Sequence, residues 1–174
     1  MIKRELYINQ IRPFIGKDVV KVITGLRRSG KSVLLDLLKD EISDPEHSIY
    51  LNFESKKNAK FANADALYDS VMEKIGDSKD KWYLFFDEIQ EVESWEEAVN
   101  SFRVDFNADI YITGSNAKLL SGELATLISG RYVQSHRPPL QVVVCIRPYK
   151  GHLHAPPKGG CHKHYYLPAA KSGL

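Results

Sequence analysis

The sequence predicts an α/β fold in which a parallel sheet lies between layers of helices, and three observations indicate it. Apolar segments rich in β-branched residues alternate with segments whose apolar residues recur at helical spacing. The first of these strands leads into a glycine-rich loop and then a helix. The 174 residues suffice for one ordinary domain with its own core. Because strands separated by helices form parallel sheets covered on both faces, we expect three layers.

The first quarter of the chain alternates helix, strand and helix. Apolar residues recur at roughly helical spacing up to Gly16, which predicts an N-terminal helix. Residues 19–24 are continuous and β-branched, the pattern of a strand buried on both faces. A helix follows the glycine-rich loop and stops before Pro45, since proline has no backbone N–H to donate. Residues 48–53 are the second predicted strand.

The middle of the chain continues the alternation. Residues 64–75 carry apolar side chains on one helical face, and residues 82–86 form an apolar strand. The next helix spans 94–106, and Ser94 with Glu97 three residues later predicts a capping box at its start.

The last predicted elements are short. Residues 109–113 form the fourth strand, residues 121–129 a short helix, and residues 131–134 the start of a fifth strand.

Composition excludes several classes of protein. Hydrophobic residues make up 43% and charged residues 26%, which is typical of a globular chain rather than a disordered one. The longest apolar runs are about seven residues long, far below the roughly 20 that a membrane-spanning helix needs. Two cysteines exclude a disulfide scaffold. The first five residues lead into no apolar signal core, so we expect a cytoplasmic protein without membrane contact.

The chain changes character at Gln134. All 22 Asp and Glu lie at or before Glu123, whereas residues 135–174 hold six Lys and Arg and no acid. We therefore predict a core over residues 1–134 and a basic tail, rich in proline and histidine, over 135–174. Two interpretations of the tail stay open: a shift of reading frame near Ser135, or a genuine loop-rich extension.

One part of this tail is apolar. Residues 140–146 form a β-prone run with two alternative fates. It pairs with the edge of the sheet as a fifth strand, or it stays unpaired and promotes aggregation.

Residues 25–32, G-L-R-R-S-G-K-S, match the phosphate-loop pattern G-x-x-x-x-G-K-[ST] at every fixed position. Gly25 and Gly30 let the backbone turn so that successive N–H groups point at phosphate oxygens. The helix that follows adds the positive end of its dipole. Lys31 is expected to reach the β- and γ-phosphates and Ser32 to bind Mg²⁺. The alternative is an ordinary glycine-rich turn followed by an exposed lysine.

The placement of this loop between a strand and a helix favours a P-loop NTPase core that binds ATP with Mg²⁺. ATP is favoured over GTP because the sequence has no Asn-Lys-x-Asp motif for guanine. The predicted nucleotide-binding residues are Gly25, Leu26, Arg27, Arg28, Ser29, Gly30, Lys31, Ser32 and Val33.

An acidic pair ends the third strand. The apolar residues 84–86 run directly into Asp87 and Glu88. In P-loop ATPases an aspartate at this place holds Mg²⁺ together with the loop serine, here Ser32. A glutamate after it is placed to orient or deprotonate the attacking water. Gln90 and the glutamates that follow it are expected to form a solvated face.

A polar group of residues also ends the fourth strand. In the class of P-loop proteins that use a catalytic glutamate, the next strand lies between the loop strand and the acidic strand, and its polar end contacts the γ-phosphate or the attacking water. Thr113, Ser115 and Asn116 are the candidates for this sensor role, and Asn116 is also a candidate catalytic residue. The alternative is an ordinary polar turn.

Two further residues are candidates for the site. Asn52 ends the second strand, where its amide is expected to hydrogen-bond Glu88 and hold it away from water in the resting state. Arg131 is a candidate for stabilising the charge of the transition state, in its own chain or in a neighbouring subunit. A surface salt bridge is the alternative for Arg131.

The sequence resembles the AAA+-like prokaryotic P-loop ATPases that carry a C-terminal domain of unknown function. The resemblance rests on residues 25–32, the strand with Asp87 and Glu88, residues 110–116, and Gly130-Arg131-Tyr132. It covers about residues 1–134. At residues 135–139 the sequence departs from the family, whose fifth strand continues toward a helical lid and a second domain.

This resemblance implies a sheet in the order 5-1-4-3-2, with the fifth strand in doubt, and hydrolysis of ATP with Mg²⁺. Lys31 and Ser32 would bind phosphate and metal, Asp87 and Glu88 would serve the metal and the water, and Asn116 or a neighbour would act as sensor. The alternative function is a nucleotide-dependent switch without appreciable turnover. A homo-oligomer or a protein partner stays open, and nucleic-acid binding rests on the charge of the tail alone.

Overall fold

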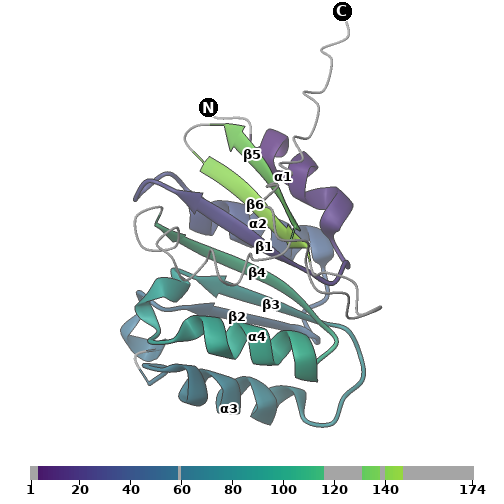
Figure 1. Ribbon diagram of the computed structural model, residues 1–174, viewed down its shortest axis with the longest axis vertical. Helices are drawn as coiled ribbons and strands as arrows, with labels where there is room; N and C mark the ends of the chain where they lie inside the picture. Colours follow the sequence, from purple (N-terminus) through teal and green to yellow (C-terminus); the bar gives the residue numbers. More distant parts are fainter. Residues whose placement is uncertain (1–3, 59, 116–130, 138–139, 147–174) are drawn as a thin grey trace, which may run out of the picture.

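The computed structural model describes residues 4–58, 60–115, 131–137 and 140–146, and these contain a six-stranded sheet (Figure 1). The strands are β1 (Val19–Gly25), β2 (Ser48–Asn52), β3 (Trp82–Asp87), β4 (Ala108–Ser115), β5 (Arg131–Arg137) and β6 (Leu140–Ile146). The α-helices are α1 (Glu5–Ile11), α2 (Lys31–Ile42), α3 (Ala64–Ile75) and α4 (Trp95–Asp105). The 3-10 helices are η1 (Arg12–Phe14), η2 (Lys56–Asn58) and η3 (Ile89–Glu91).

The order of the strands is β2-β3-β4-β1-β6-β5, and the first four are parallel. This confirms the predicted α/β fold with a parallel sheet. It also confirms that β4 lies between β1, which leads into the phosphate loop, and β3, which ends in the acidic pair.

The other edge of the sheet differs from the expected order. The family resemblance implies that the strand starting at Arg131 lies beside β1, but β6 lies there and runs antiparallel to β1, with Leu140 opposite Gly25. β5 pairs with β6 and lies at the outer edge. Only two residues separate β5 from β6, too few for the crossover that a parallel pair requires, so the two strands form a hairpin. Of the two fates open to residues 140–146, pairing with the sheet is confirmed.

The core is divided by the sheet into two layers. Helices α3 and α4 cover one face, where Leu67 and Phe102 pack against alternate residues of the strands such as Ile112. Helices α1 and α2 cover the other face, where Leu34 packs among side chains such as Tyr111. Successive residues of a strand point to opposite faces, which explains why the buried strands are apolar at nearly every position.

Local signals explain some helix boundaries and not others. Asn63 caps α3, since its side chain accepts a hydrogen bond from the Ala66 N–H at 2.9 Å. The capping box predicted at α4 is wrong: Ser94 makes no side-chain cap and has a left-handed backbone with φ of +54°. The first helix is shorter than predicted and ends in the 3-10 turn η1, which contains Pro13.

The N-terminal helix is attached to α2 at both of its ends. Arg4 donates from Nη1 to the Gly30 carbonyl at 2.6 Å, at the start of α2. Arg12 donates from Nε and Nη2 to the carboxylate of Glu41 at 2.6 and 3.0 Å, near the end of α2. The α1 helix therefore lies along α2, and Arg4, the residue directly before α1, contacts the phosphate loop.

A buried ion pair lies at the opposite end of the strands. Lys21 and Asp109 are fully buried and bonded to each other, and Asp109 also accepts from the Tyr111 hydroxyl at 2.9 Å and the Gly16 N–H at 2.7 Å. Burial lowers the pKa of Lys21, against the pull of Asp109. This network joins β1, β4 and the turn after η1.

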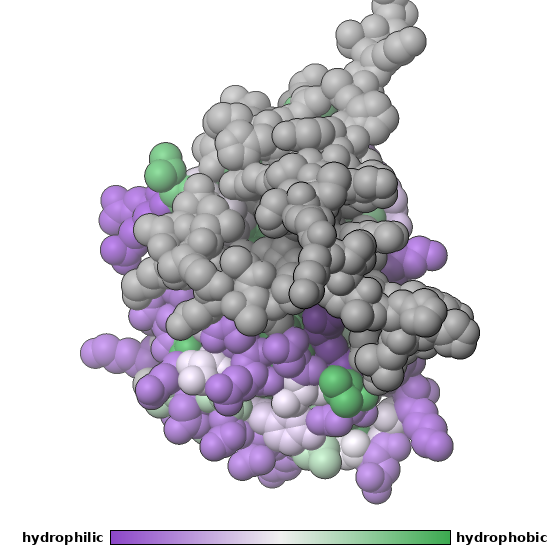
Figure 2. All heavy atoms as spheres, in the orientation of Figure 1, coloured by the Kyte–Doolittle hydropathy of each residue, from purple (hydrophilic) through white to green (hydrophobic). Residues whose placement is uncertain are grey.

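The surface over α3 and α4 is mostly hydrophilic, with isolated hydrophobic side chains (Figure 2). Exposed apolar residues such as Met72 and Val104 are scattered in this layer, which is normal for a folded domain. Among the described residues, none of the helices has the length and apolar character that a bilayer crossing requires.

Candidate active site

The parallel strands bring four chain segments to one edge of the sheet. Gly25 lies opposite Ser115 in the pairing of β1 with β4, and Asn52 lies opposite Asp87 in the pairing of β2 with β3. The phosphate loop, the acidic pair and the polar end of β4 therefore meet, as the sequence predicts. In doubly wound sheets this carboxyl edge is where ligands bind.

The phosphate loop connects β1 directly to the N-terminus of α2. Gly30 has φ of +90°, in the left-handed region that a side chain would strain, and Arg28 also has a left-handed backbone with φ of +62°. The Gly30 carbonyl accepts the first hydrogen bond of α2, from the Leu34 N–H at 3.1 Å. The N–H groups of the first turn of α2, which have no partners within the helix, thus face the loop and suit an anion.

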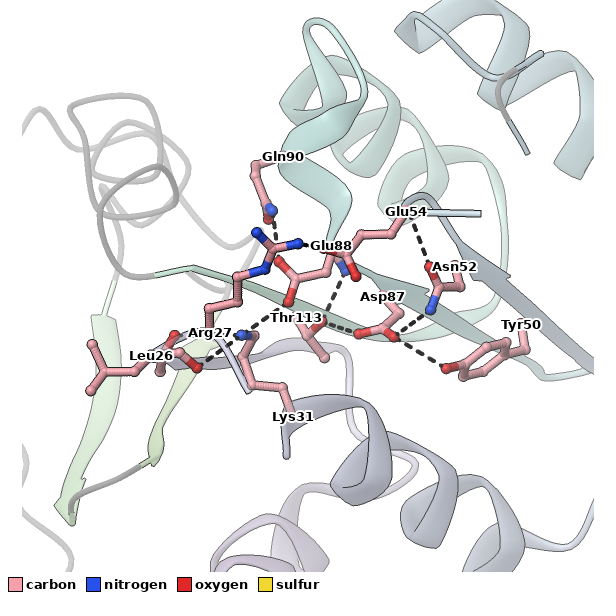
Figure 3. Close-up of polar contacts among 11 residues, drawn as sticks. Leu26, Arg27, Lys31, Tyr50, Asn52, Glu54, Asp87, Glu88, Gln90 and Thr113 are labelled. Atoms are coloured by element: carbon pink, nitrogen blue, oxygen red, sulfur yellow. Dashed lines mark hydrogen bonds and ion pairs between the residues drawn. The ribbon is translucent and has the colours of Figure 1, made fainter. Parts of the chain in front are cut away.

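Lys31 folds back over this loop and pairs with Glu88. Its Nζ lies 2.9 Å from Glu88 Oε1, and 3.4 Å from the carbonyls of both Gly25 and Leu26. Figure 3 shows Lys31 between the Leu26 carbonyl and the carboxylate of Glu88. The side chain of Lys31 is only 3% exposed and that of Glu88 12% exposed, so the pair is largely shielded from water.

Asp87 is fully buried and held by neutral donors. Thr113 Oγ1 donates to Asp87 Oδ1 at 2.5 Å, and Asn52 Nδ2 donates to Oδ2 at 2.9 Å. The Tyr50 hydroxyl donates to Oδ2 at 3.4 Å (Figure 3). Burial, and after it the charge of Asp87, raises the pKa of Tyr50 above its ordinary value, so this hydroxyl stays a donor.

Glu88 follows Asp87 with a left-handed backbone, φ of +54°, which turns the chain from β3 into η3. Its N–H donates to Thr113 Oγ1 at 3.0 Å, so one threonine hydroxyl positions both acids. Gln90 Nε2 donates to Glu88 Oε2 at 2.7 Å. The two carboxylate oxygens of Glu88 therefore have different partners, Lys31 on Oε1 and Gln90 on Oε2.

An open pocket of about 630 Å³ lies over these residues. Among the described residues it is lined by Arg27, Lys31, Phe53, Glu54, Glu88, Gln90, Glu91 and Ser115. Its volume lies in the range of small-molecule and cofactor sites, and its lining is mainly polar and charged. A ligand that carries negative charge would meet the loop and Lys31 on one side and the carboxylates on the other.

The residues present fit a phosphate group and a cation. The Ser29 hydroxyl, in the phosphate loop, is buried and has no hydrogen-bond partner in the described segments, so a ligand oxygen would satisfy it. Asp87 is a buried carboxylate whose partners in the described part of the chain are all neutral. Since a buried charge normally has a counter-charge, a cation such as Mg²⁺ beside Asp87 suits this environment.

The prediction for Asn52 is wrong. Its amide donates to Asp87, whereas Glu88 is held by Lys31 and Gln90. The physical reason is the register, in which Asn52 lies directly opposite Asp87 and so faces the first acid of the pair.

The other predicted residues have different placements. Arg27 lines the pocket and lies 3.5 Å from Glu54, in an exposed ion pair. Leu26 and Val33 are exposed, and Ser32 lies partly exposed in the first turn of α2. Of the sensor candidates, Thr113 holds the two acids and Ser115 lines the pocket. Asn116, the side chain of Arg131 and the predicted helix at 121–129 lie outside what the structure describes.

Two residues of the site were not expected from the sequence. The sequence predicts Gln90 on a solvated face, but this residue lines the pocket and donates a hydrogen bond to Glu88. Tyr50 reaches Asp87 from the second strand. A signal existed for Tyr50, because residues two apart in a strand share a face and Asn52 was already a candidate. No pattern pointed to Gln90, since its position depends on the turn that Glu88 makes.

Comparison with known proteins agrees with this architecture. Residues 17–143 match the model of a family described as an AAA domain. The chain belongs to the AAA domain family. The AAA domain match begins just before β1 and ends within β6, so it contains the strand ends and the loop that form the site. The chain is thereby assigned to the nucleotide-binding domains of the AAA type.

Two curated relatives of this AAA domain are prokaryotic, and both are named as uncharacterized proteins. One, from Haemophilus influenzae, is 48% identical over 159 residues, which cover 89% of this chain and 38% of the relative. The other, from Methanocaldococcus jannaschii, is 38% identical over 142 residues, which cover 80% of this chain and 30% of the relative. The chain thus spans about a third of the length of these relatives. The boundary predicted at Gln134 stays a prediction.

Proposed function

We propose that this chain binds ATP with Mg²⁺ and hydrolyses it to ADP and phosphate. The observation that carries the proposal is the meeting of Lys31, at the end of the phosphate loop, with Glu88, at the end of β3, 2.9 Å apart in one pocket. A cation placed for phosphate and a carboxylate placed for water are the two parts that phosphoryl transfer to water requires.

Binding of the nucleotide would begin with an exchange of partners. The phosphates are proposed to lie against the backbone N–H groups of the loop and the first turn of α2, with the Ser29 hydroxyl as a further donor. Lys31 would leave Glu88 for the β- and γ-phosphates. The exchange replaces one anionic partner by another, so the lysine never stays buried without a counter-charge.

Ser32 and Asp87 would hold the metal, which would supply positive charge against the charge of the phosphates. Thr113, Asn52 and Tyr50 would keep the carboxylate of Asp87 in place, since they are its hydrogen-bond donors. Because all three donors are neutral, the negative charge of Asp87 would remain available to the metal.

Glu88 would act as general base once Lys31 has left it. Its Oε1 would take one proton from a water molecule, whose oxygen forms a bond to the γ-phosphorus. The bond from the γ-phosphorus to the bridging oxygen breaks, and ADP keeps the bonding electrons. Lys31 would stabilise the charge that develops on the phosphate oxygens.

The remaining roles extend the proposal. Asn116 or Ser115 would sense the γ-phosphate, and Arg131 would contribute positive charge in its own chain or in a neighbouring subunit. A cytoplasmic location, and a second copy or a protein as partner, also remain proposals, as does any activity of the full-length relatives.

Titration of the full chain with ATP and Mg²⁺ tests the proposal. We expect saturable binding of ATP. Lys31→Ala should weaken this binding roughly 100-fold or more, because the β- and γ-phosphates would lose their buried cationic partner. Lys74→Ala, which removes an exposed lysine of α3, is the matched control and should bind as the wild type does. Failure of the wild type to bind would overturn the proposal.

Measurement of ADP release then separates an enzyme from a switch. Glu88→Gln should lower kcat by roughly 10²- to 10⁴-fold, the usual contribution of a general base. The same variant should bind ATP more tightly than the wild type, because Lys31 no longer has to leave a carboxylate. Tight binding by the wild type with no turnover would favour the alternative, a nucleotide-dependent switch.

A further inference from the structure

The backbone around Gln90 is held firmly by the core. Gln90 lies in η3 between Ile89, which is fully buried, and Val92, which is 2% exposed. The N–H of Val92 donates to the Ile89 carbonyl at 3.0 Å, and the N–H of Glu93 donates to the Ala62 carbonyl at 2.9 Å. The side chain of Gln90, which lines the pocket, therefore extends from a backbone that the core holds in place.

The two ends of the Gln90 amide have different environments. Nε2 donates to Glu88 Oε2 at 2.7 Å, and this assignment follows from the chemistry, since an amide oxygen would repel the carboxylate. Oε1 is buried and has no partner among the residues that the structure describes. An unsatisfied buried oxygen at the wall of a pocket is suited to accept a hydrogen bond from something that enters the pocket.

We propose that Gln90 is a second water-binding residue, whose Nε2 holds Glu88 while its Oε1 accepts a hydrogen bond from the attacking water. This inference rests on the proposed hydrolysis. The water would donate one hydrogen to Glu88 Oε1 and the other to Gln90 Oε1. Its lone pair would then be directed away from both residues, toward the γ-phosphorus. The proton goes to Glu88 as described above, and Gln90 neither gains nor loses one.

When the nucleotide binds, the position of the Glu88 carboxylate would depend on Gln90. Glu88 is restrained on both sides, by Lys31 at 2.9 Å and by Gln90 at 2.7 Å. Once phosphates attract Lys31 away, Gln90 is the side-chain partner that remains among the described residues. It would keep Oε2 in place while Oε1 becomes free for the water. Loss of this restraint would cost orientation and leave nucleotide affinity nearly intact.

Steady-state kinetics of two variants test the proposal. Gln90→Ala removes both contacts, and Gln90→Glu keeps the size of the side chain but replaces its donor with a second carboxylate. Both should lower kcat roughly 10- to 100-fold. Gln90→Ala, which adds no charge, should leave the Kd for ATP within about twofold, whereas the second carboxylate of Gln90→Glu should also weaken ATP binding by repelling the phosphates. Gln10→Ala is the matched control, because the Oε1 of Gln10 on α1 is also buried without a partner in the described segments. An unchanged kcat in either variant, or a Kd for ATP that rises in Gln90→Ala in step with the fall in kcat, would overturn the role of Gln90.

A binding measurement makes the test independent of turnover. ADP with Mg²⁺ and aluminium fluoride imitates the transferring phosphoryl group and retains the water opposite the leaving ADP. Gln90→Ala should weaken the binding of this complex roughly tenfold more than it weakens the binding of ADP with Mg²⁺ alone. Equal effects on both complexes would contradict the inference. If the wild type binds ATP but neither hydrolyses it nor gains affinity from aluminium fluoride, the proposed hydrolysis fails and the inference fails with it. If the wild type hydrolyses and the variant equals it, only the inference fails.

A pair of variants tests whether Gln90 acts through Glu88. Glu88→Asp keeps a carboxylate but withdraws it from Gln90 by one methylene. In this background Gln90→Ala should lower kcat much less than it does in the wild type, because the contact is already lost. If Gln90→Ala lowers kcat by the same factor in both backgrounds, Gln90 acts independently of Glu88 and the proposal is overturned.

Discussion

Two buried aspartates in this molecule are stabilised in different ways. Asp109 has a buried cation, Lys21, as its partner, in addition to two hydrogen-bond donors. Asp87 has only neutral donors within the described residues. Because Lys21 already supplies the counter-charge of Asp109, this ion pair suits a structural role. A carboxylate held by neutral groups keeps its charge for a ligand, which is why Asp87 is the better candidate for metal binding.

Thr113 connects the two acids, and its substitution gives the first prediction at the scale of the residue. Thr113→Val keeps the shape of the side chain but removes the donor to Asp87 and the acceptor for the Glu88 N–H. The free energy of unfolding should fall by about 1–3 kcal/mol, the cost of leaving such buried groups unsatisfied. Urea unfolding measures this change.

Thr24 supplies the control for this prediction. It is buried in β1, and its hydroxyl has no partner in the described segments. Thr24→Val should therefore leave the unfolding free energy unchanged or raise it. Equal losses in the two variants would mean that burial of the hydroxyl, and not its bonds to the acids, determines the effect.

At the scale of the element, α1 joins the phosphate loop to the far end of α2. Apolar side chains of α1, such as Tyr7 and Ile11, pack in the same cluster as Leu34 and Leu38 of α2. The arginine contacts at the two ends, to the Gly30 carbonyl and to Glu41, determine how α1 lies along α2. A helix so placed supports the first turn of α2, where the phosphates are proposed to bind.

The contact of Arg12 with Glu41 predicts a pH dependence. The hydrogen bond from Arg12 lowers the pKa of Glu41 below its ordinary value of 4.5. A group whose pKa is lowered by folding contributes stability above its ordinary pKa, and this contribution disappears as the pH falls through the lowered value. Glu41→Gln should therefore be less stable than the wild type at neutral pH, with the difference vanishing in strong acid.

Urea unfolding at about pH 7 and about pH 2.5 measures this difference. The control is Glu73→Gln, which changes an exposed glutamate of α3 and should leave stability the same at both values. A difference between Glu41→Gln and the wild type that persists in acid would contradict the assigned cause.

At the scale of the whole molecule, the hairpin of β5 and β6 completes the sheet. β6 pairs with all seven residues of β1, the strand that leads into the phosphate loop. Leu140, at the start of β6, is 3% exposed and packs in the cluster under α1 and α2. Without β6, the backbone of β1 would present unpaired N–H and C=O groups at an open edge.

Truncation tests this role of the hairpin. A chain that ends at Gln134 loses β6, so we expect its Tm to fall by more than about 5 °C and its solubility to decrease. A chain that ends at Ile146 keeps every described strand and should retain both properties. If the chain ending at Gln134 is as stable and soluble as the full chain, β6 does not protect the edge of β1.

Much of this architecture could be predicted from local patterns. The alternation of strands and helices and the bounds of α3 agree with the expectation from these patterns. The position of β4 between β1 and β3 is implied by the likeness to P-loop proteins, and the strand order agrees with it. The phosphate loop and the acidic pair could be located because each combines fixed residue types with a strand directly before it. The predicted capping box failed because its pattern requires an extended backbone at Ser94, and the structure has a left-handed one.

Periodicity and motifs of adjacent residues are sufficient to predict the fold class, the family and the residues at the strand ends. Which side chains contact one another depends instead on how the elements pack. Asn52 contacts Asp87 because of the register of two strands, and Gln90 contacts Glu88 because of a left-handed turn in the backbone. The edge position of β5 likewise follows from pairing between segments. Such contacts depend on geometry between elements, which the periodicity within one element does not contain.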